Sequence, residues 1–105
     1  MYGMLYRLQP RQGQEQMVLD TLFRWEQEIL PIVTGFVGGY IYQPQPGSAS
    51  EIVGIFLFAE QADFARTQAD PQHVQWYQNL LLLVEAVPEY GEGEFTEFMK
   101  ELRGL

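Results

Sequence analysis

Cysteine is absent from the 105-residue sequence, and histidine occurs once. Without cysteine the chain can form neither a disulfide framework nor a thiolate zinc site, and it offers no thiol nucleophile. One imidazole leaves too few ligands for a compact transition-metal site, and no loop has the carboxylate spacing of a hard-cation site. We therefore expect no metal and no cofactor.

Basic residues are also scarce, because six Lys and Arg stand against fourteen Asp and Glu. The formal net charge is -8 and the isoelectric point is near 4.4. Binding to nucleic acid depends on cations that neutralise phosphates, and anionic membrane surfaces likewise attract basic segments. We expect neither nucleic acid nor a membrane as a partner.

Long apolar runs are missing as well. The longest, around 52–59 and 80–84, fall far short of the ~20 residues that span a bilayer. No basic leader precedes an apolar stretch near Met1. Because the hydrophobic fraction of 47% is ordinary for a globular protein, we expect a soluble, cytoplasmic protein with one domain over 1–105.

Alternating or continuous apolar residues predict four strands. Their ranges are 2–8, 36–43, 51–59 and 94–99. The second and third strands are joined by the turn residues Pro44, Pro46, Gly47 and Ser48, which indicate a hairpin with a rather long loop. Residues 100–105 form a tail.

Helical spacing of apolar residues predicts the helices between these strands. One stripe, made by Val18, Leu22, Trp25 and Ile29, indicates a helix over 14–30 that Pro31 ends. A short helix follows over about 60–68. Another begins at the cap Asp70 and Pro71 and is closed by Pro88.

The order β-α-β-β-α-β predicts an α+β fold of the ferredoxin-like type, with a four-stranded antiparallel sheet. Two helices can cover only one face of such a sheet. The third strand nevertheless has apolar residues on both faces, with Ile52, Phe56 and Phe58 on one and Val53, Ile55 and Leu57 on the other.

An apolar sheet face left in water would exceed the few hundred Å² that monomers usually expose. A two-fold partner is the commonest cover, and we expect a homodimer. The alternative is that the tail 100–105 folds over this face, although it is short for that task.

Several segments make the chain resemble the antibiotic-biosynthesis-monooxygenase-like proteins of the dimeric α/β-barrel superfamily. They are the helix end Leu30-Pro31, the segment Gly35–Tyr40, the third strand running into 58–64, and the segment Asp70–Trp76. The resemblance implies two sheets that close into a barrel at a dimer interface, and a pocket between the helices and the sheet of each subunit. Known members oxidise aromatic polyketides without a cofactor, oxidise quinols or degrade haem, and some have no established activity.

His73 and Tyr77 are the candidate catalytic residues. The resemblance implies that His73 lies near the pocket mouth, where its near-neutral pKa suits a base. The alternative, which we favour, is a surface residue at the start of the helix. Tyr77 could donate a hydrogen bond to an aromatic ligand or pack in the core.

Four further aromatic residues are candidates for ligand binding: Trp76, Trp25, Phe56 and Tyr6. Each has a simpler role available. Trp25 and Trp76 lie on the apolar helix stripes and so fit a core, and Tyr6 could be an interface tyrosine with its hydroxyl at the rim, like Tyr40 and Tyr42. The sequence leaves these alternatives open.

Two functions are open, of which the resemblance implies the first. The first is a cofactor-independent monooxygenase for a small aromatic or polyketide-like molecule, in which the substrate supplies the electrons and the protein supplies a dry pocket, orientation and a proton acceptor. The second is a non-catalytic dimeric module that binds a small apolar ligand. A buried phenol or imidazole in a pocket would favour the first, and a filled core the second.

Other functions fit less well. Haem-degrading members carry an asparagine on the first strand, where this chain has Tyr6-Arg7, and its only asparagine is Asn79. An RNA-binding sheet of the same strand order needs an exposed basic and aromatic face, but the third strand has no basic residue. The acidic run from Glu85 to Glu101 is typical of a solvated surface.

Overall fold

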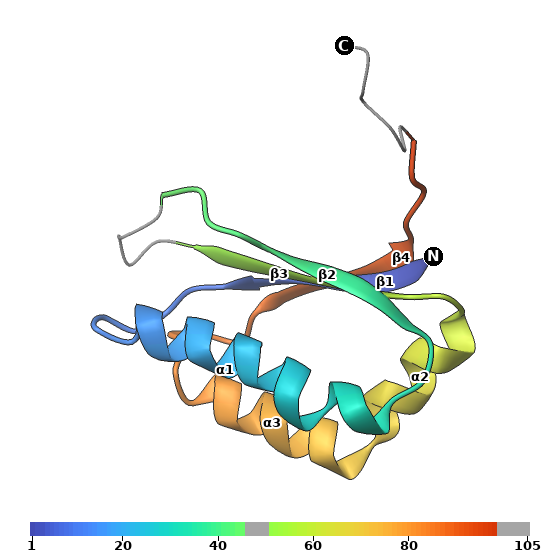
Figure 1. The fold of residues 1–105 in the computed structure, drawn as a ribbon. Helices are drawn as coiled ribbons and strands as arrows, with labels where there is room; N and C mark the ends of the chain where they lie inside the picture. Colours follow the sequence, from blue (N-terminus) through green and yellow to red (C-terminus); the bar gives the residue numbers. More distant parts are fainter. Residues whose placement is uncertain (46–50, 99–105) are drawn as a thin grey trace.

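The computed structural model describes residues 1–45 and 51–98. Its elements follow the predicted order, with one 3-10 turn (η1) added after the first helix (Figure 1). They are β1 (Tyr2–Leu8), α1 (Glu15–Glu28), η1 (Leu30–Ile32), β2 (Phe36–Tyr42), β3 (Ile52–Phe58), α2 (Gln61–Ala69), α3 (Pro71–Leu81) and β4 (Glu89–Glu94). The predicted turn residues Pro46, Gly47 and Ser48 and the predicted tail 100–105 lie outside the described residues.

The four strands form one antiparallel sheet in the order β2-β3-β1-β4. This order is that of a ferredoxin-like fold, so the fold class predicted from the sequence is confirmed. The first and third strands of the chain occupy the centre, and β2 and β4 are its edges. A bulge at Val37 shifts the register of β2 against β3 between Phe36 and Gly38.

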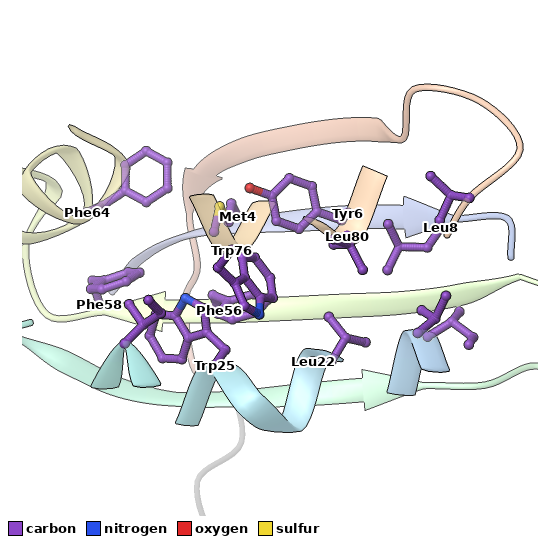
Figure 2. Close-up of a cluster of buried hydrophobic side chains, with 14 residues drawn as sticks. Met4, Tyr6, Leu8, Leu22, Trp25, Phe56, Phe58, Phe64, Trp76 and Leu80 are labelled. Atoms are coloured by element: carbon purple, nitrogen blue, oxygen red, sulfur yellow. The ribbon is translucent and has the colours of Figure 1, made fainter. Parts of the chain in front are cut away.

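Helices α1 and α3 lie side by side under one face of the sheet (Figure 1). The strands place their larger apolar side chains against these helices, and Met4, Leu8 and Phe58 are fully buried there. The predicted stripe of α1 is buried too, since Val18, Leu22, Trp25 and Ile29 are at most 6% exposed. Figure 2 shows side chains from both helices and from β1 and β3 meeting in this core.

The start of α3 follows the predicted capping chemistry. The carboxylate of Asp70 accepts a hydrogen bond from the backbone N–H of Gln72 at 2.8 Å, and Pro71 occupies the first turn. This cap fixes where α3 begins, and therefore which of its residues face α1.

The predicted end of α3 was wrong, because the helix stops at Leu81 rather than near Pro88. Beyond it the backbone pairs with the loop after β1: Arg11 N–H donates to the carbonyl of Leu83 at 2.9 Å, and Val84 forms a bridge with Pro10. The apolar run looked helical in sequence, but a contact with a distant segment ends the helix.

The last strand was also misplaced. It was predicted at 94–99 but runs over Glu89–Glu94, where it pairs with β1 from Tyr2 to Arg7. Glu92 faces the helix side between Tyr2 and Tyr90 and accepts their hydroxyl hydrogen bonds at 2.5 and 2.6 Å. These bonds hold the pKa of Glu92 below its usual value. The last strand therefore contains a hydrogen-bonded carboxylate, whereas the apolar pattern had placed the strand over the residues that follow.

Gly35, before β2, has a left-handed backbone conformation and leaves no space for a side chain. Its φ is +77°, and a Cβ there would overlap the carboxyl group of Asp63. Gly13 has a similar φ of +82° but has no atom within 4 Å of the corresponding position. A side chain at Gly13 would meet only the strain of left-handed backbone, whereas one at Gly35 would also overlap Asp63. Comparing substitutions at the two positions therefore separates the two energetic costs.

We predict that Gly13→Ala lowers the free energy of unfolding by about 1 kcal/mol, because only the backbone is strained. Gly35→Ala should lower it by about 2–4 kcal/mol, because overlap with Asp63 is added. Urea titrations of both variants measure the difference. Equal losses would show that the side chain of Asp63 moves aside.

Candidate functional site

A pocket of about 380 Å³ lies between α1 and the strands β2 and β3. Its lining is largely aromatic and aliphatic. The residues are Leu22, Phe23, Trp25, Glu26, Leu30, Phe36, Gly39, Tyr40, Ile41, Ile55 and Phe56. A concave site of this size and composition suits a small, mostly apolar molecule.

Three rings make up one wall of the pocket. The Trp25 ring lies 4.8 Å from that of Phe36 and 5.0 Å from that of Phe56, in tilted and edge-to-face arrangements. Gly39 leaves room beside them, because a Cβ at this position would lie 2.7 Å from the carbonyl oxygen of Ile55. The wall is thus set by close packing of α1 against the first half of β2 and the centre of β3.

The indole of Trp25 is held by a buried hydrogen bond. Its Nε1–H donates to Nδ1 of His73 at 3.0 Å, joining α1 to α3. Since Nδ1 accepts, the proton of the neutral imidazole sits on Nε2. That atom is buried and makes no hydrogen bond within residues 1–45 and 51–98.

His73 is therefore not the surface residue that we favoured from the sequence, since it is only 2% exposed. Burial lowers its pKa to about 4, and the nearby charge of Asp70 opposes the shift only in part. The sequence could not reveal this, because the partner Trp25 lies 48 positions away. At neutral pH the imidazole is uncharged, and its acceptor is already in use.

Trp76 makes the reciprocal connection between the helices. Its Nε1–H donates to the backbone carbonyl of Thr21 in α1 at 2.7 Å, and its ring lies 6.0 Å from that of Phe56. Figure 2 shows the two indoles on either side of Phe56. At 4% exposure, Trp76 is part of the core behind the pocket wall rather than of its lining.

Tyr6 and Tyr77 lie farther along the same layer. Their rings stack at 5.2 Å, and Tyr6 also contacts Phe56 at 6.2 Å and Tyr90 at 5.6 Å. Burial raises the pKa of Tyr6 and of Tyr77, so both phenols keep their protons at neutral pH. In this state they can donate hydrogen bonds but cannot act as bases.

The structure brings all six predicted site residues into one chain of ring contacts. Only Trp25 and Phe56 line the pocket; His73, Trp76, Tyr6 and Tyr77 stand behind it. Glu26 of α1 lines the pocket but was not among the candidate residues predicted from the sequence. Its spacing of three from Phe23 and four from Leu30 could have indicated a second stripe on that helix.

Neither a metal cluster nor a spanning helix is found in the described part of the chain. No three His, Asp or Glu side chains there are placed to hold a metal ion. No helix there has the length and hydropathy needed to cross a membrane.

Solved structures with the same fold include known oxygenases. SnoaB, a cofactor-independent oxygenase from Streptomyces nogalater, matches with a TM-score of 0.79 and 17% identity over 95% of this chain and 97% of its own. A conserved protein from Methanosarcina mazei matches with a TM-score of 0.75 and 9% identity, over 90% of this chain and 92% of its own. An antibiotic biosynthesis monooxygenase matches with a TM-score of 0.70 and 10% identity, over 92% of this chain and 100% of its own.

At such identities the likeness shows a shared fold. The chain has the ferredoxin-like fold of the antibiotic biosynthesis monooxygenases, which confirms the predicted resemblance at that level. No protein-family model matches the sequence, and no curated protein does. The activity must therefore be argued from the pocket itself.

We predict that His73 makes stability depend on pH. The unfolded histidine titrates near 6.5 and the buried one near 4, so the unfolded chain binds the proton more readily. The contribution of His73 to the free energy of unfolding is fully present above pH 6.5 and is lost as the pH drops toward 4. Between pH 7 and pH 5 the loss is about 2 kcal/mol.

His73→Asn provides the matched comparison, because its Oδ1 can replace Nδ1 as the acceptor for Trp25 while nothing titrates. Urea unfolding at pH 7 and pH 5 should show a smaller pH effect in this variant than in the natural chain. His73→Leu removes the acceptor as well and should be less stable than His73→Asn by about 1–3 kcal/mol at pH 7. An unchanged pH effect in His73→Asn would contradict the assignment.

Proposed function

We propose that this protein binds a small, flat aromatic molecule in the pocket between α1 and β2 and promotes its oxidation by O2 without a cofactor. The observation that supports this most is the pocket of about 380 Å³ with Trp25, Phe36 and Phe56 in one wall. The cofactor-independent oxygenase SnoaB shares the fold.

A hydroquinone illustrates the proposed chemistry. The electrons come from the ring, so that 1,4-dihydroxynaphthalene and O2 give a hydroxynaphthoquinone and water. One C–H bond, both phenolic O–H bonds and the O–O bond break, and one new C–O bond forms on the ring. Of the three hydrogens released, one ends on the new hydroxyl group, and two leave with the second oxygen atom as water. The protein has to orient the ring, exclude water and accept a proton.

We assign different roles to the six predicted site residues. Trp25 and Phe56 contact the ligand. His73 acts as a positioning residue, because its acceptor fixes the orientation of the Trp25 indole. Trp76, Tyr6 and Tyr77 support the wall from behind. Proton transfer by His73 or Tyr77 stays a prediction.

The second candidate is a binding module without catalysis. It is favoured by the composition of the pocket lining, which contains no histidine and, apart from Glu26 and Tyr40, no ionisable side chain. A module would bind the same aromatic ligands but would not change them. Measuring binding and oxygen incorporation in parallel separates the two functions.

We predict that the protein converts 1,4-dihydroxynaphthalene under 18O2 to a hydroxynaphthoquinone carrying one labelled atom. Autoxidation instead gives the quinone and hydrogen peroxide. Ile41→Trp fills the pocket from β2 and should reduce both ligand binding and labelled product at least about tenfold. Mass spectrometry and calorimetry are the measurements.

Val87→Trp is the control for this experiment, because Val87 is 82% exposed and lies outside the pocket. It should behave like the natural chain. Binding without labelled product would favour the module. An Ile41→Trp variant that binds and reacts normally would exclude this pocket as the site.

We also propose that two copies pair through the sheet face opposite the helices. Tyr40 and Tyr42 lie on this face, where they pair with Ile55 and Val53, and are 67% and 59% exposed. No described helix covers it, and residues 95–98, which follow β4, rise on that side of the sheet (Figure 1). Phe98, at the end of this segment, is 91% exposed. A second copy would bury these side chains.

We predict that the protein sediments at twice the 12.2 kDa mass of the chain. Tyr42→Glu places a charge on the apolar sheet face and should weaken association at least about tenfold. Val74→Glu adds the same charge on α3, on the helix side, and should leave the mass unchanged. A natural chain that is monomeric at micromolar concentration would contradict the proposal.

A further inference from the structure

We infer that Glu26 selects the ligand of the pocket, favouring a hydroxylated aromatic molecule and disfavouring an aromatic acid. This inference rests on the proposed binding function and adds the class of ligand. Glu26 is a charged residue in a pocket that is otherwise lined mainly by aromatic and aliphatic side chains.

The position of Glu26 follows from the two stripes of α1. Leu22 and Trp25 of α1 and Ile29, which follows its last residue, are buried in the core. Phe23 and Glu26 of α1 and Leu30, the first residue of η1, follow one another at spacings of three and four along the flank that faces β2. All three flank residues line the pocket. Phe23 is 57% exposed, so this flank lies at the mouth and Glu26 stands at the rim.

The charge at this rim is not balanced by a nearby cation. Glu26 is the only charged residue that lines the pocket, and no ion pair involves it among the described residues. Arg7 pairs with Glu51 and Glu89, and Arg66 pairs with Asp63. Arg24, two residues before Glu26 on α1, does not line the pocket and donates to the hydroxyl of Thr21 instead. An entering acid would therefore meet a carboxylate and no cation.

The three rings of the wall offer no free donor to an acid, and Tyr40 is the pocket-lining side chain that has a hydroxyl donor. The indole N–H of Trp25 is the polar group that an aromatic wall usually offers, but it already donates to His73. A carboxylate such as Glu26 only accepts hydrogen bonds, and those from hydroxyl groups are strengthened by its charge. A phenolic hydroxyl at the mouth is thus the group that complements this rim.

Three naphthalenes of similar size test the inference by calorimetry at pH 7: 1-naphthol, 1-methoxynaphthalene and 1-naphthoate. We expect 1-naphthol to bind about tenfold more tightly than 1-methoxynaphthalene, which cannot donate. We expect 1-naphthoate to bind more weakly than either, and to gain affinity in 0.5 M salt as repulsion is screened.

Glu26→Gln should bring the three affinities to within about threefold of one another, because it removes the charge but keeps an amide of the same shape. Glu28→Gln is the matched control: it makes the same change in net charge on the same helix, outside the pocket, and should leave the order unchanged.

The outcomes separate the inference from the proposed function. If 1-methoxynaphthalene and 1-naphthol bind equally and 1-naphthoate is not disfavoured, Glu26 does not select and the pocket proposal still stands. If Glu28→Gln changes the order as much as Glu26→Gln, the effect comes from overall charge and the inference is overturned. If none of the three binds, both proposals fall.

Discussion

Two reciprocal hydrogen bonds tie the helices of this protein together. Trp25 of α1 donates its indole N–H to His73 of α3, and Trp76 of α3 donates its own to the carbonyl of Thr21 in α1. Each of the two indole donors has a partner on the other helix, so neither helix can slide without leaving an indole N–H unsatisfied. With Phe56 of β3 in contact with both indoles, the helix pair is also fixed to the sheet.

The pocket is a consequence of this arrangement. The buried stripe of α1 packs against α3 and the centre of the sheet. The flank of the helix therefore faces the edge strand β2. The hollow there is lined by Gly39, which has no side chain, and by Trp25 and Phe36, whose rings pack in a tilted arrangement. The packed layer behind the wall gives the pocket a defined shape, which orientation of a small aromatic ligand requires.

Local chemistry in the sequence predicted much of this fold. The cap at Asp70, the buried stripe of α1 and the two apolar faces of β3 depend on neighbours in sequence or on the period of a helix or strand, and each is confirmed. What failed depends on distant contacts. The early end of α3 needs the pairing of Val84 with Pro10, and the burial of His73 needs Trp25.

The candidate site shows the same division. Trp25 and Phe56 were among the six candidates and line the pocket, but periodicity cannot tell a ring that lines a hollow from a ring that fills the core. Trp25 and Trp76 look equivalent in sequence, and only the packing of β2 makes one of them a wall. Glu26 was not considered, because a charged residue on a helix usually faces solvent and is not expected in a pocket.

The alternation of β3 links the pocket to the proposed dimer. Phe56 points toward the helices and forms the pocket wall, while its neighbours Ile55 and Leu57 belong to the opposite face. Ile55 of the central strand β3 and Tyr40 of the edge strand β2, which pair with each other, also line the pocket. In the proposed dimer the partner would press on these residues, so pairing would bear on the shape of the site. A strand that is apolar on both faces would then serve binding through one face and assembly through the other.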